Sequence, residues 1–219
     1  MMKKILAALA VMFITTTTAQ AASVTFDFLS GSNASVGWTQ GNLNYSSGGV
    51  DLSVKAGNYS GGNVQDTGWV RQYNGYGLTV WNGTGDNNHE IDGNRGNDVA
   101  IFSFSEDVYL ESVTFNYNDN RDQFAYFFDN GDNGSLDLIN SSLDANPTDT
   151  YQFLGALLKS GDLFGIGAIA SNDDFKIASI TVGTISAVPL PAALPLYGAG
   201  MAIIGFVGWR RKRKLAAAA

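Results

Sequence analysis

The central part of the chain alternates apolar and polar positions with a period of two, which is typical of half-buried β-strands. Val24, Phe26 and Phe28 begin this pattern, and no stretch sustains the 3.6-residue period of an amphipathic helix of normal length. Clusters of Gly, Asn and Asp separate the apolar segments and suit tight turns. The pattern predicts an all-β domain with strands near residues 24–28, 50–54, 78–81, 99–104, 113–117, 124–128, 163–168 and 175–182.

The number and spacing of these strands suit a β-sandwich, with connections like those of a jelly roll. Turns are expected in the Gly/Asn/Asp clusters, including residues 57–63 and 129–134, and a helical turn is an alternative for residues 156–159. The chain has 219 residues and no cysteine, so its core must form without disulfide bonds.

The N-terminal segment has the three parts of a secretory signal peptide. Lys3 and Lys4 precede an apolar stretch at residues 5–14, and the small residues Ala19 and Ala21 form an A-x-A cleavage site. The apolar stretch is too short to span a membrane. We therefore expect signal peptidase to remove residues 1–21 and the rest of the chain to be exported.

The C-terminal segment has three consecutive parts. Residues 190–209 carry no charge, and at about 1.5 Å per residue they predict one transmembrane helix covering roughly 30 Å. Prolines at its outer boundary favour an extended backbone, and the cations that follow it favour the cytoplasm. The boundary motif is Val188, Pro189, Leu190, Pro191 and Ala192, and the basic cluster is Arg210, Arg211, Lys212, Arg213 and Lys214, followed by a tail at 215–219.

This order of motif, apolar span and basic cluster resembles the VPLPA variant of the PEP-CTERM sorting signals, which exosortase-type transpeptidases process in Gram-negative bacteria. The resemblance implies that residues 188–214 are a sorting signal recognised by such an enzyme. It also implies that the domain at residues 22–187 passes from an inner-membrane intermediate to the cell surface or the extracellular matrix of a biofilm. An ordinary single-pass membrane anchor is the alternative.

Short segments of the domain resemble the ectodomains of exosortase-dependent surface proteins. They include Gly75-Tyr76-Gly77 and His89-Glu90-Ile91-Asp92, and all lie within residues 75–182. This family is defined by its architecture and its sorting, so the resemblance implies a location rather than an activity.

Charge is distributed unevenly along the chain. The predicted domain holds six basic residues and all 20 acidic residues, which gives it a net charge of −14. Such a field disfavours nucleic acid and anionic membranes as partners, and favours divalent cations or neutral polymers. A solvated surface that resists aggregation is the simpler interpretation of the same charge.

The sequence offers little for catalysis. His89 is the only histidine and cysteine is absent, which restricts triads and excludes a thiol nucleophile. Glu90 and Asp92 resemble the start of the E-x-D-x-x-E signature of laminarinase-type glucanases, which act through paired carboxylates. Arg95 stands where the third acid belongs. We therefore expect no enzymatic activity, with a degenerate glycan hydrolase as the least favoured alternative.

Two kinds of binding site remain open. Calcium takes oxygen ligands, and the Asp-rich clusters make Asp129, Asp132, Asp119 and Asp122 candidate ligands, although such clusters are more often plain turns. Trp69 and Trp81 are candidates for stacking against sugar rings, and Trp38, Tyr73 and Tyr76 lie in similar Gly/Asn-rich segments. Aromatic residues in a β-sandwich nevertheless belong more often to the core.

Taken together, these patterns predict a non-enzymatic surface or matrix protein with a structural or adhesive role and no required cofactor. Its expected partners are signal peptidase, an exosortase-type enzyme and the membrane. The alternative function is a calcium-dependent, lectin-like module that binds extracellular polysaccharide.

Overall fold

The computed structural model describes residues 22–83, 89–119, 121–129, 134–145 and 149–185, together with residue 201. Ala21–Ile185 form one compact unit, here called the module. No helix among the described residues is long and apolar enough to cross a membrane. The predicted signal peptide, sorting motif and basic cluster lie outside the described residues, as does the predicted span apart from Met201.

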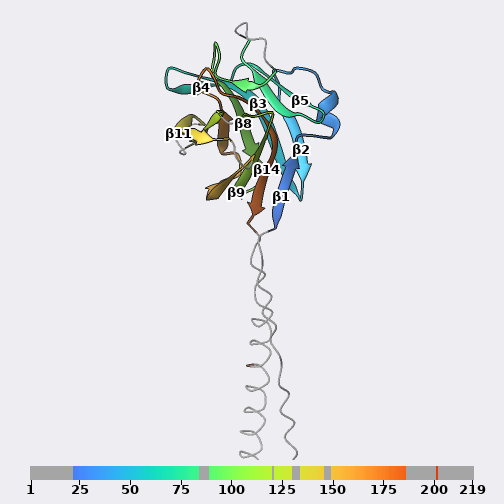
Figure 1. Cartoon of the computed structure of the whole chain (residues 1–219). Coiled ribbons are helices and arrows are strands. Elements are labelled where there is room, and N and C mark those ends of the chain that lie inside the picture. The colour runs from blue at the N-terminus through green and yellow to red at the C-terminus, as the bar shows by residue number, and fades with distance from the viewer. Residues whose placement is uncertain are drawn as a thin grey trace, which may run out of the picture. The chain divides into compact units, whose positions relative to one another are not determined.

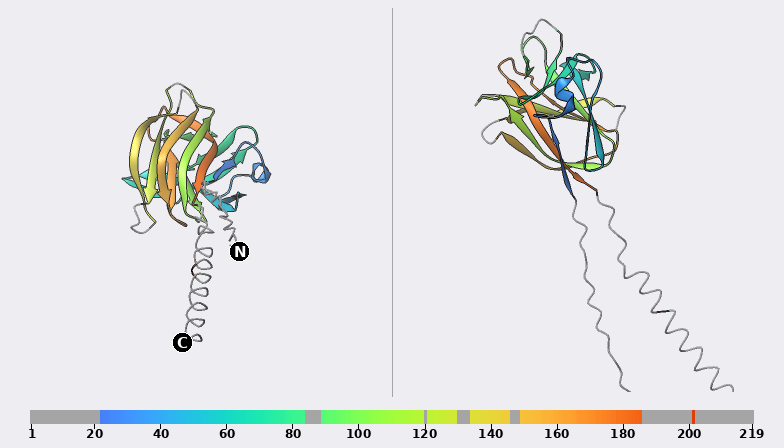
Figure 2. Two further views of the ribbon diagram at one scale, coloured as in Figure 1. Left: turned by 90° about the horizontal axis from the view of Figure 1, so that it is seen from below. Right: turned by 90° about the vertical axis from the view of Figure 1, so that its right-hand side faces the viewer.

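The described part of the module is built from β-strands, with a single short 3-10 turn, η1 (Ser32–Ser35), which confirms the predicted all-β class. Figures 1 and 2 show η1, in blue, at the rim of the module. The strands are β1 (Ser23–Asp27), β2 (Leu43–Ser47), β3 (Val50–Ser60), β4 (Asn63–Gln65), β5 (Trp69–Tyr73), β6 (Gly77–Trp81), β7 (Ile91–Asp92), β8 (Asp98–Phe104), β9 (Val108–Asn116), β10 (Gln123–Asp129), β11 (Leu136–Asp144), β12 (Thr150–Leu158), β13 (Leu163–Gly167) and β14 (Asp174–Thr184).

These strands form two antiparallel sheets, an arrangement consistent with a β-sandwich. The first sheet has the order β12-β9-β14-β6-β5, and β1 and β7 also pair with β14. The second has the order β11-β10-β13-β8-β3-β2, with β4 paired to β3. One hydrophobic core draws side chains from both sheets, including Phe26 of β1, Phe102 of β8 and Ile180 of β14. Removal of this apolar surface from water is the main force that holds the sheets together.

Strand β14 organises the first sheet. One of its edges pairs with β9, and the other pairs in turn with β7, β6 and β1. Gly77 allows β6 to approach, because a Cβ atom at this position would lie 2.5 Å from the Ile177 carbonyl oxygen. The Thr184 amide donates to the Ala22 carbonyl at 2.9 Å, so the two ends of the module lie side by side (Figure 1).

Two sequence predictions were wrong in detail. Residues 156–158 are strand rather than helical turn, because Ala156 and Leu158 pair with Leu110 and Val108 of β9. Part of the predicted turn at 57–63 is also strand: Gly57 pairs with Val99, in a place where a Cβ atom would lie 2.6 Å from Ile101 Cδ1. Both glycine and strong helix formers such as alanine and leucine can occupy strands where cross-strand packing decides the outcome.

Candidate functional site

The hairpin of β5 and β6 places two tryptophans opposite each other. Its register pairs Trp69 with Trp81, and the two ring centroids are 4.8 Å apart. Val70 and Gln72 point from the other face of β5 and are fully buried. Gly83 follows β6 with φ +85°, and a Cβ atom there would lie 2.6 Å from the Trp69 ring. The glycine therefore leaves space for the indole to lie against the backbone.

A third tryptophan joins this pair from a segment 31 residues earlier than Trp69. Thr39 forms an isolated antiparallel bridge with Val70, through backbone hydrogen bonds of 3.1 and 2.8 Å. This bridge fixes the neighbouring Trp38 beside β5. The Trp38 centroid lies 5.9 Å from that of Trp81, within the range of favourable aromatic pairs.

Two further rings complete the cluster. Trp38 lies 6.3 Å from Tyr73 and 6.1 Å from His89, and the Tyr73 and His89 centroids are 5.7 Å apart. We call the set Trp38, Trp69, Tyr73, Trp81 and His89 the aromatic platform. The sequence indicated Trp38, Trp69, Tyr73 and Trp81 as candidate aromatic residues, but it did not indicate their contacts or that His89 would join them.

The aromatic platform lies outside the hydrophobic core. None of its members belongs to either core cluster among the described residues, whereas phenylalanines such as Phe26 and Phe102 are fully buried there. The tryptophans and Tyr73 are partly exposed and His89 is exposed. Trp69 and Trp81 therefore do not fit the alternative interpretation, in which the aromatic residues of a β-sandwich belong to its core.

Polar groups lie beside the rings. Arg71 and Thr79 are cross-strand partners between the indole pair and Tyr73, and the Arg71 guanidinium lies 4.1 Å from the Tyr73 ring centroid. In the described part of the chain, Arg71 Nε and Thr79 Oγ1 are buried without a hydrogen-bond partner. Such groups cost free energy when left unpaired, so a water molecule or a ligand hydroxyl that reached them would be stabilised.

Tyr76 does not join the aromatic platform. It lies in the turn between β5 and β6, is 53% exposed, and contacts Tyr117 with ring centroids 6.2 Å apart. A position in a Gly/Asn-rich segment is therefore not enough to place an aromatic residue in the aromatic platform.

The acidic residues near the start of β10 and β14 have a different role. Asp122 Oδ1 accepts from the Asp174 amide at 3.3 Å, and Asp173 Oδ1 accepts from the Gln123 amide at 3.1 Å. The other oxygen of Asp122 accepts from the Asp119 amide, and that of Asp173 accepts from the Ala170 amide. We call Asp122 and Asp173 the carboxylate junction, because each holds the backbone beside the other's strand.

Burial shapes the electrostatics of this region. Desolvation raises the pKa of Asp122 and that of Asp173 above the ordinary aspartate value. It also raises the pKa of Asp174 to about 6, an effect to which the nearby charges of Asp122 and Glu90 add. Each of these groups thus binds a proton more readily than in an unfolded chain.

The predicted calcium ligands do not converge in the described residues. Asp119 accepts from the Arg121 guanidinium at 2.9 Å, and this contact lowers the pKa of Asp119. Asp122 precedes β10 whereas Asp129 ends it, so that they stand about 20 Å apart along a strand. Asp132 lies outside the described residues. Within the described ranges, no three Asp, Glu or His side chains form a group that could hold a metal ion.

The two carboxylates of the glucanase-like string are also engaged. Glu90 pairs with the Lys176 ammonium at 3.1 Å, and Lys176 lies 4.0 Å from the Tyr117 ring centroid. Asp92 is 1% exposed, and its Oδ1 accepts from the Asn94 amide at 2.8 Å. Neither side chain presents the open carboxylate that a glycosidase needs on each side of its substrate.

Comparison of the chain with protein-family models, with curated proteins and with solved structures gives no significant match.

Proposed function

We propose that this chain is an exported, non-enzymatic surface or matrix protein whose module binds neutral polysaccharide through the aromatic platform. The observation that carries this proposal is the convergence of Trp38, Trp69, Trp81 and Tyr73 into one partly exposed cluster outside the core. The signal peptide and the VPLPA-type signal predicted from the sequence support export and sorting by an exosortase-type enzyme.

The chemistry of sugars explains why such a cluster suits them. A pyranose ring has apolar C–H faces, and an indole offers a large, rigid apolar surface with an N–H donor at its edge. Binding to partly exposed rings costs little conformational entropy, because an indole side chain has only two torsions to fix. The net charge of −14 expected for the module favours a neutral polymer over an anionic one.

The engaged state of Glu90 and Asp92 supports a role in binding rather than hydrolysis. Removal of the Glu90 carboxylate from Lys176 would leave a nearly buried ammonium without its partner, which is costly. Within this proposal, the two sheets form a jelly-roll-like sandwich that serves as a rigid support for the aromatic platform. Calcium is not required, because the Asp119 and Asp122 oxygens already accept hydrogen bonds from the backbone amides of residues 119, 121 and 174.

Retention on insoluble polysaccharides tests the binding proposal. Full-length protein should be retained by at least one of cellulose, chitin, curdlan and insoluble xylan, and Trp69→Ala or Trp81→Ala should abolish that retention. Tyr109→Ala is the matched control, because Tyr109 is 41% exposed on β9 and lies outside the aromatic platform. Glu90→Gln should leave retention unchanged. Retention that survives both tryptophan changes, or hydrolysis that Glu90→Gln abolishes, would overturn the proposal.

Sorting is tested separately. Replacing Pro189 and Pro191 by alanine should allow a helix to extend outward and remove the extended recognition segment. The protein should then accumulate uncut in the inner membrane, as followed by fractionation and mass spectrometry. Normal arrival of this double variant at the surface would favour the ordinary membrane anchor.

A further inference from the structure

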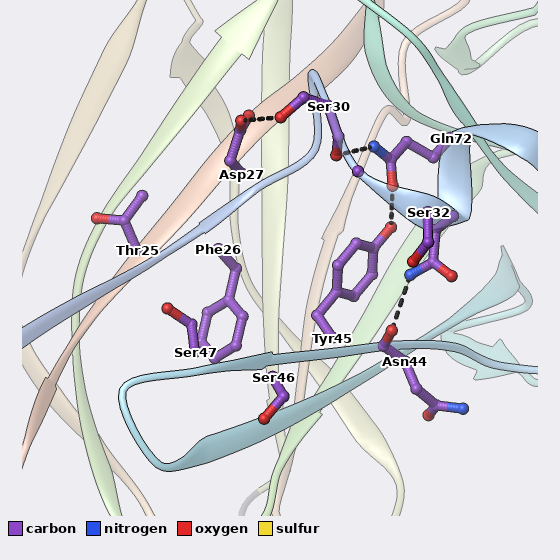
Figure 3. Close-up of a pocket in the computed structure, with 12 residues that line it drawn as sticks. Thr25, Phe26, Asp27, Ser30, Ser32, Asn44, Tyr45, Ser46, Ser47 and Gln72 are labelled. Carbon is purple, nitrogen blue, oxygen red and sulfur yellow. Dashed lines mark hydrogen bonds between the residues drawn. The ribbon is translucent and has the colours of Figure 1, made fainter.

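A polar pocket opens between β1 and β2, and its lining includes none of the residues of the aromatic platform. Its volume is about 300 Å³, and its wall combines the end of β1, the η1 segment, β2 and one residue of β5 (Figure 3). The residues that matter for its chemistry are Asp27, Ser30, Asn33, Tyr45, Ser47 and Gln72. Within the described strands, β1 pairs only with β14 and β2 only with β3, so each is an edge strand beside this opening.

The pocket has a rigid polar wall. The Tyr45 hydroxyl donates to Gln72 Oε1 at 2.9 Å, and Gln72 Nε2 donates to the Ser30 carbonyl at 2.7 Å. Gln72 is fully buried, so this chain of hydrogen bonds is fixed by the packing of β5. Burial raises the pKa of the Tyr45 phenol, which keeps it neutral. Figure 3 shows the Phe26 and Tyr45 rings between the two strands, where they add an apolar surface.

Several groups on the pocket wall retain hydrogen-bonding capacity. The Ser32, Ser46 and Ser47 hydroxyls line the pocket, and no hydrogen bond occupies them within the described residues. Asp27 accepts from the Leu29 amide and from the Ser30 hydroxyl, each at 2.8 Å, and each carboxylate oxygen has a second lone pair. The wall thus offers hydrogen-bond donors and acceptors side by side, which suits a small ring that carries several hydroxyl groups.

The charge of the wall restricts the ligand class. Among the described residues, no lysine, arginine or histidine lines the pocket, and Asp27 is its only carboxylate. A phosphate, a sulfate or a uronic acid would therefore meet a carboxylate without a compensating cation. The volume lies at the lower end of the roughly 300–1,000 Å³ found for small-molecule sites, which suits one small ring rather than an oligomer.

We propose that the pocket between β1 and β2 binds a single neutral sugar unit through its hydroxyl and amide groups. The choice of ligand class rests on the proposed function, whereas the geometry involves a separate set of residues. Gln72 of the pocket and Tyr73 of the aromatic platform point from opposite faces of β5. A module with two sites of this kind would bind a branched or bundled polymer more tightly than either site alone, through effective concentration.

Nuclear magnetic resonance with simple glycosides tests this site. The probes are methyl α-D-glucopyranoside, methyl β-D-galactopyranoside and methyl α-D-mannopyranoside at about 10 mM, above the roughly millimolar affinity of a single small site. The sample is full-length ¹⁵N-labelled protein in a detergent without a sugar headgroup. At least one glycoside should shift the amides of Ser32, Ser46 and Ser47 and the Gln72 side-chain amide.

Two variants and a control sharpen the result. Ser47→Leu should fill the pocket and abolish these shifts, whereas Ser60→Leu, at the exposed end of β3, should leave them unchanged. Ser47→Ala adds no bulk and removes one hydroxyl, so it should raise the dissociation constant about two- to tenfold. This smaller change keeps the test valid if the leucine variant does not fold.

The outcomes separate this inference from the proposed function. Pocket shifts that persist in Trp81→Ala show binding at the pocket itself. Pocket shifts without any polysaccharide retention by the native protein would leave this inference standing and reject the proposed function. Shifts confined to Trp69 and Trp81, or no shift with any of the three glycosides, would overturn the inference, as would shifts unaffected by both changes at Ser47.

Discussion

The aromatic platform and the carboxylate junction both gather residue types that often bind ligands, but they use their side chains in opposite ways. At the carboxylate junction, each oxygen of Asp122 and Asp173 accepts a hydrogen bond from a backbone amide. Both side chains are almost fully buried. The platform residues instead remain partly exposed and outside the core. The first cluster therefore holds loops in place, while the second leaves its rings accessible to solvent.

The difference teaches that closeness in sequence is a poor guide to a binding site here. Asp119 and Asp122 are three residues apart and resemble a cation loop, yet their oxygens hold the loop's own backbone and Arg121. Trp38 and Trp81 are far apart in sequence but have ring centroids 5.9 Å apart. The bridge between Thr39 and Val70 makes this meeting possible.

The largest effect on stability is expected at the carboxylate junction. Asp122→Ala removes the acceptor of two part-buried hydrogen bonds from backbone amides, which should lower the free energy of unfolding by about 2–4 kcal/mol. Urea titration of the full-length protein measures this loss. Polysaccharide retention by the folded fraction should be unchanged. An unaltered unfolding midpoint would mean that the junction does not support the loops.

The opposite pattern is expected at the aromatic platform. Trp38→Ala removes a partly buried ring that contacts Trp81, Tyr73 and His89, so unfolding should become easier by about 1–2 kcal/mol. Its effect on polysaccharide affinity should be at least about tenfold, equal to about 1.4 kcal/mol. Tyr76→Ala is the control, because Tyr76 contacts Tyr117 instead. Equal losses of affinity in the two variants would break the distinction between platform and surroundings.

A smaller effect is expected from pH. The pKa of Asp174 is raised to about 6, by burial first and then by the charges of Asp122, Glu90 and Asp119, which Lys176 partly offsets. A raised pKa means that the stabilising contribution is complete below the unfolded value and is lost as pH rises through about 6. Asp174 should therefore make the module more stable at about pH 5 than at about pH 7.

Melting temperatures across that pH range check this expectation. Asp174→Asn should flatten the dependence that Asp174 causes, whereas Asp162→Asn, in a turn before β13, serves as a carboxylate control. A dependence unchanged by Asp174→Asn would assign it to other groups.

The smallest effect is expected from calcium. Because Arg121 and backbone amides already engage Asp119 and Asp122, millimolar calcium should raise the melting temperature less than Asp122→Ala lowers it. Thermal melts with calcium and with chelator make the comparison. A rise of several degrees that Asp122→Asn suppresses would instead identify this loop as a cation site.

The fold class could be predicted because apolar and polar residues alternate wherever one face of a strand meets the core, as in β1 and β3. Strand β5 could not, because Trp69, Arg71 and Tyr73 on its outer face are as large as core residues and obscure the period of two. The sequence of residues 156–158 is compatible with a helical turn, and only their pairing with β9 makes them a strand. Local pattern thus gives the class, while long-range pairing decides individual elements.

The candidate site could be predicted in part. Trp69 and Trp81 stood out as tryptophans in Gly/Asn-rich segments, but their direct pairing depends on the hairpin register. The role of His89 depends on contacts with Trp38 and Tyr73, which no local pattern reveals. The pocket between β1 and β2 had no sequence signal at all, since serine and asparagine at its rim are ordinary surface residues.

Tryptophan fluorescence tests the central claim most directly. Three of the four tryptophans lie in the aromatic platform, and Trp209→Phe removes the fourth, so the remaining emission reports on the platform alone. Titration of this variant with a soluble form of the retained polysaccharide should shift and saturate the emission at the concentration that saturates binding. Binding by calorimetry with no change in emission would contradict the account, because the polymer would then bind elsewhere on the protein.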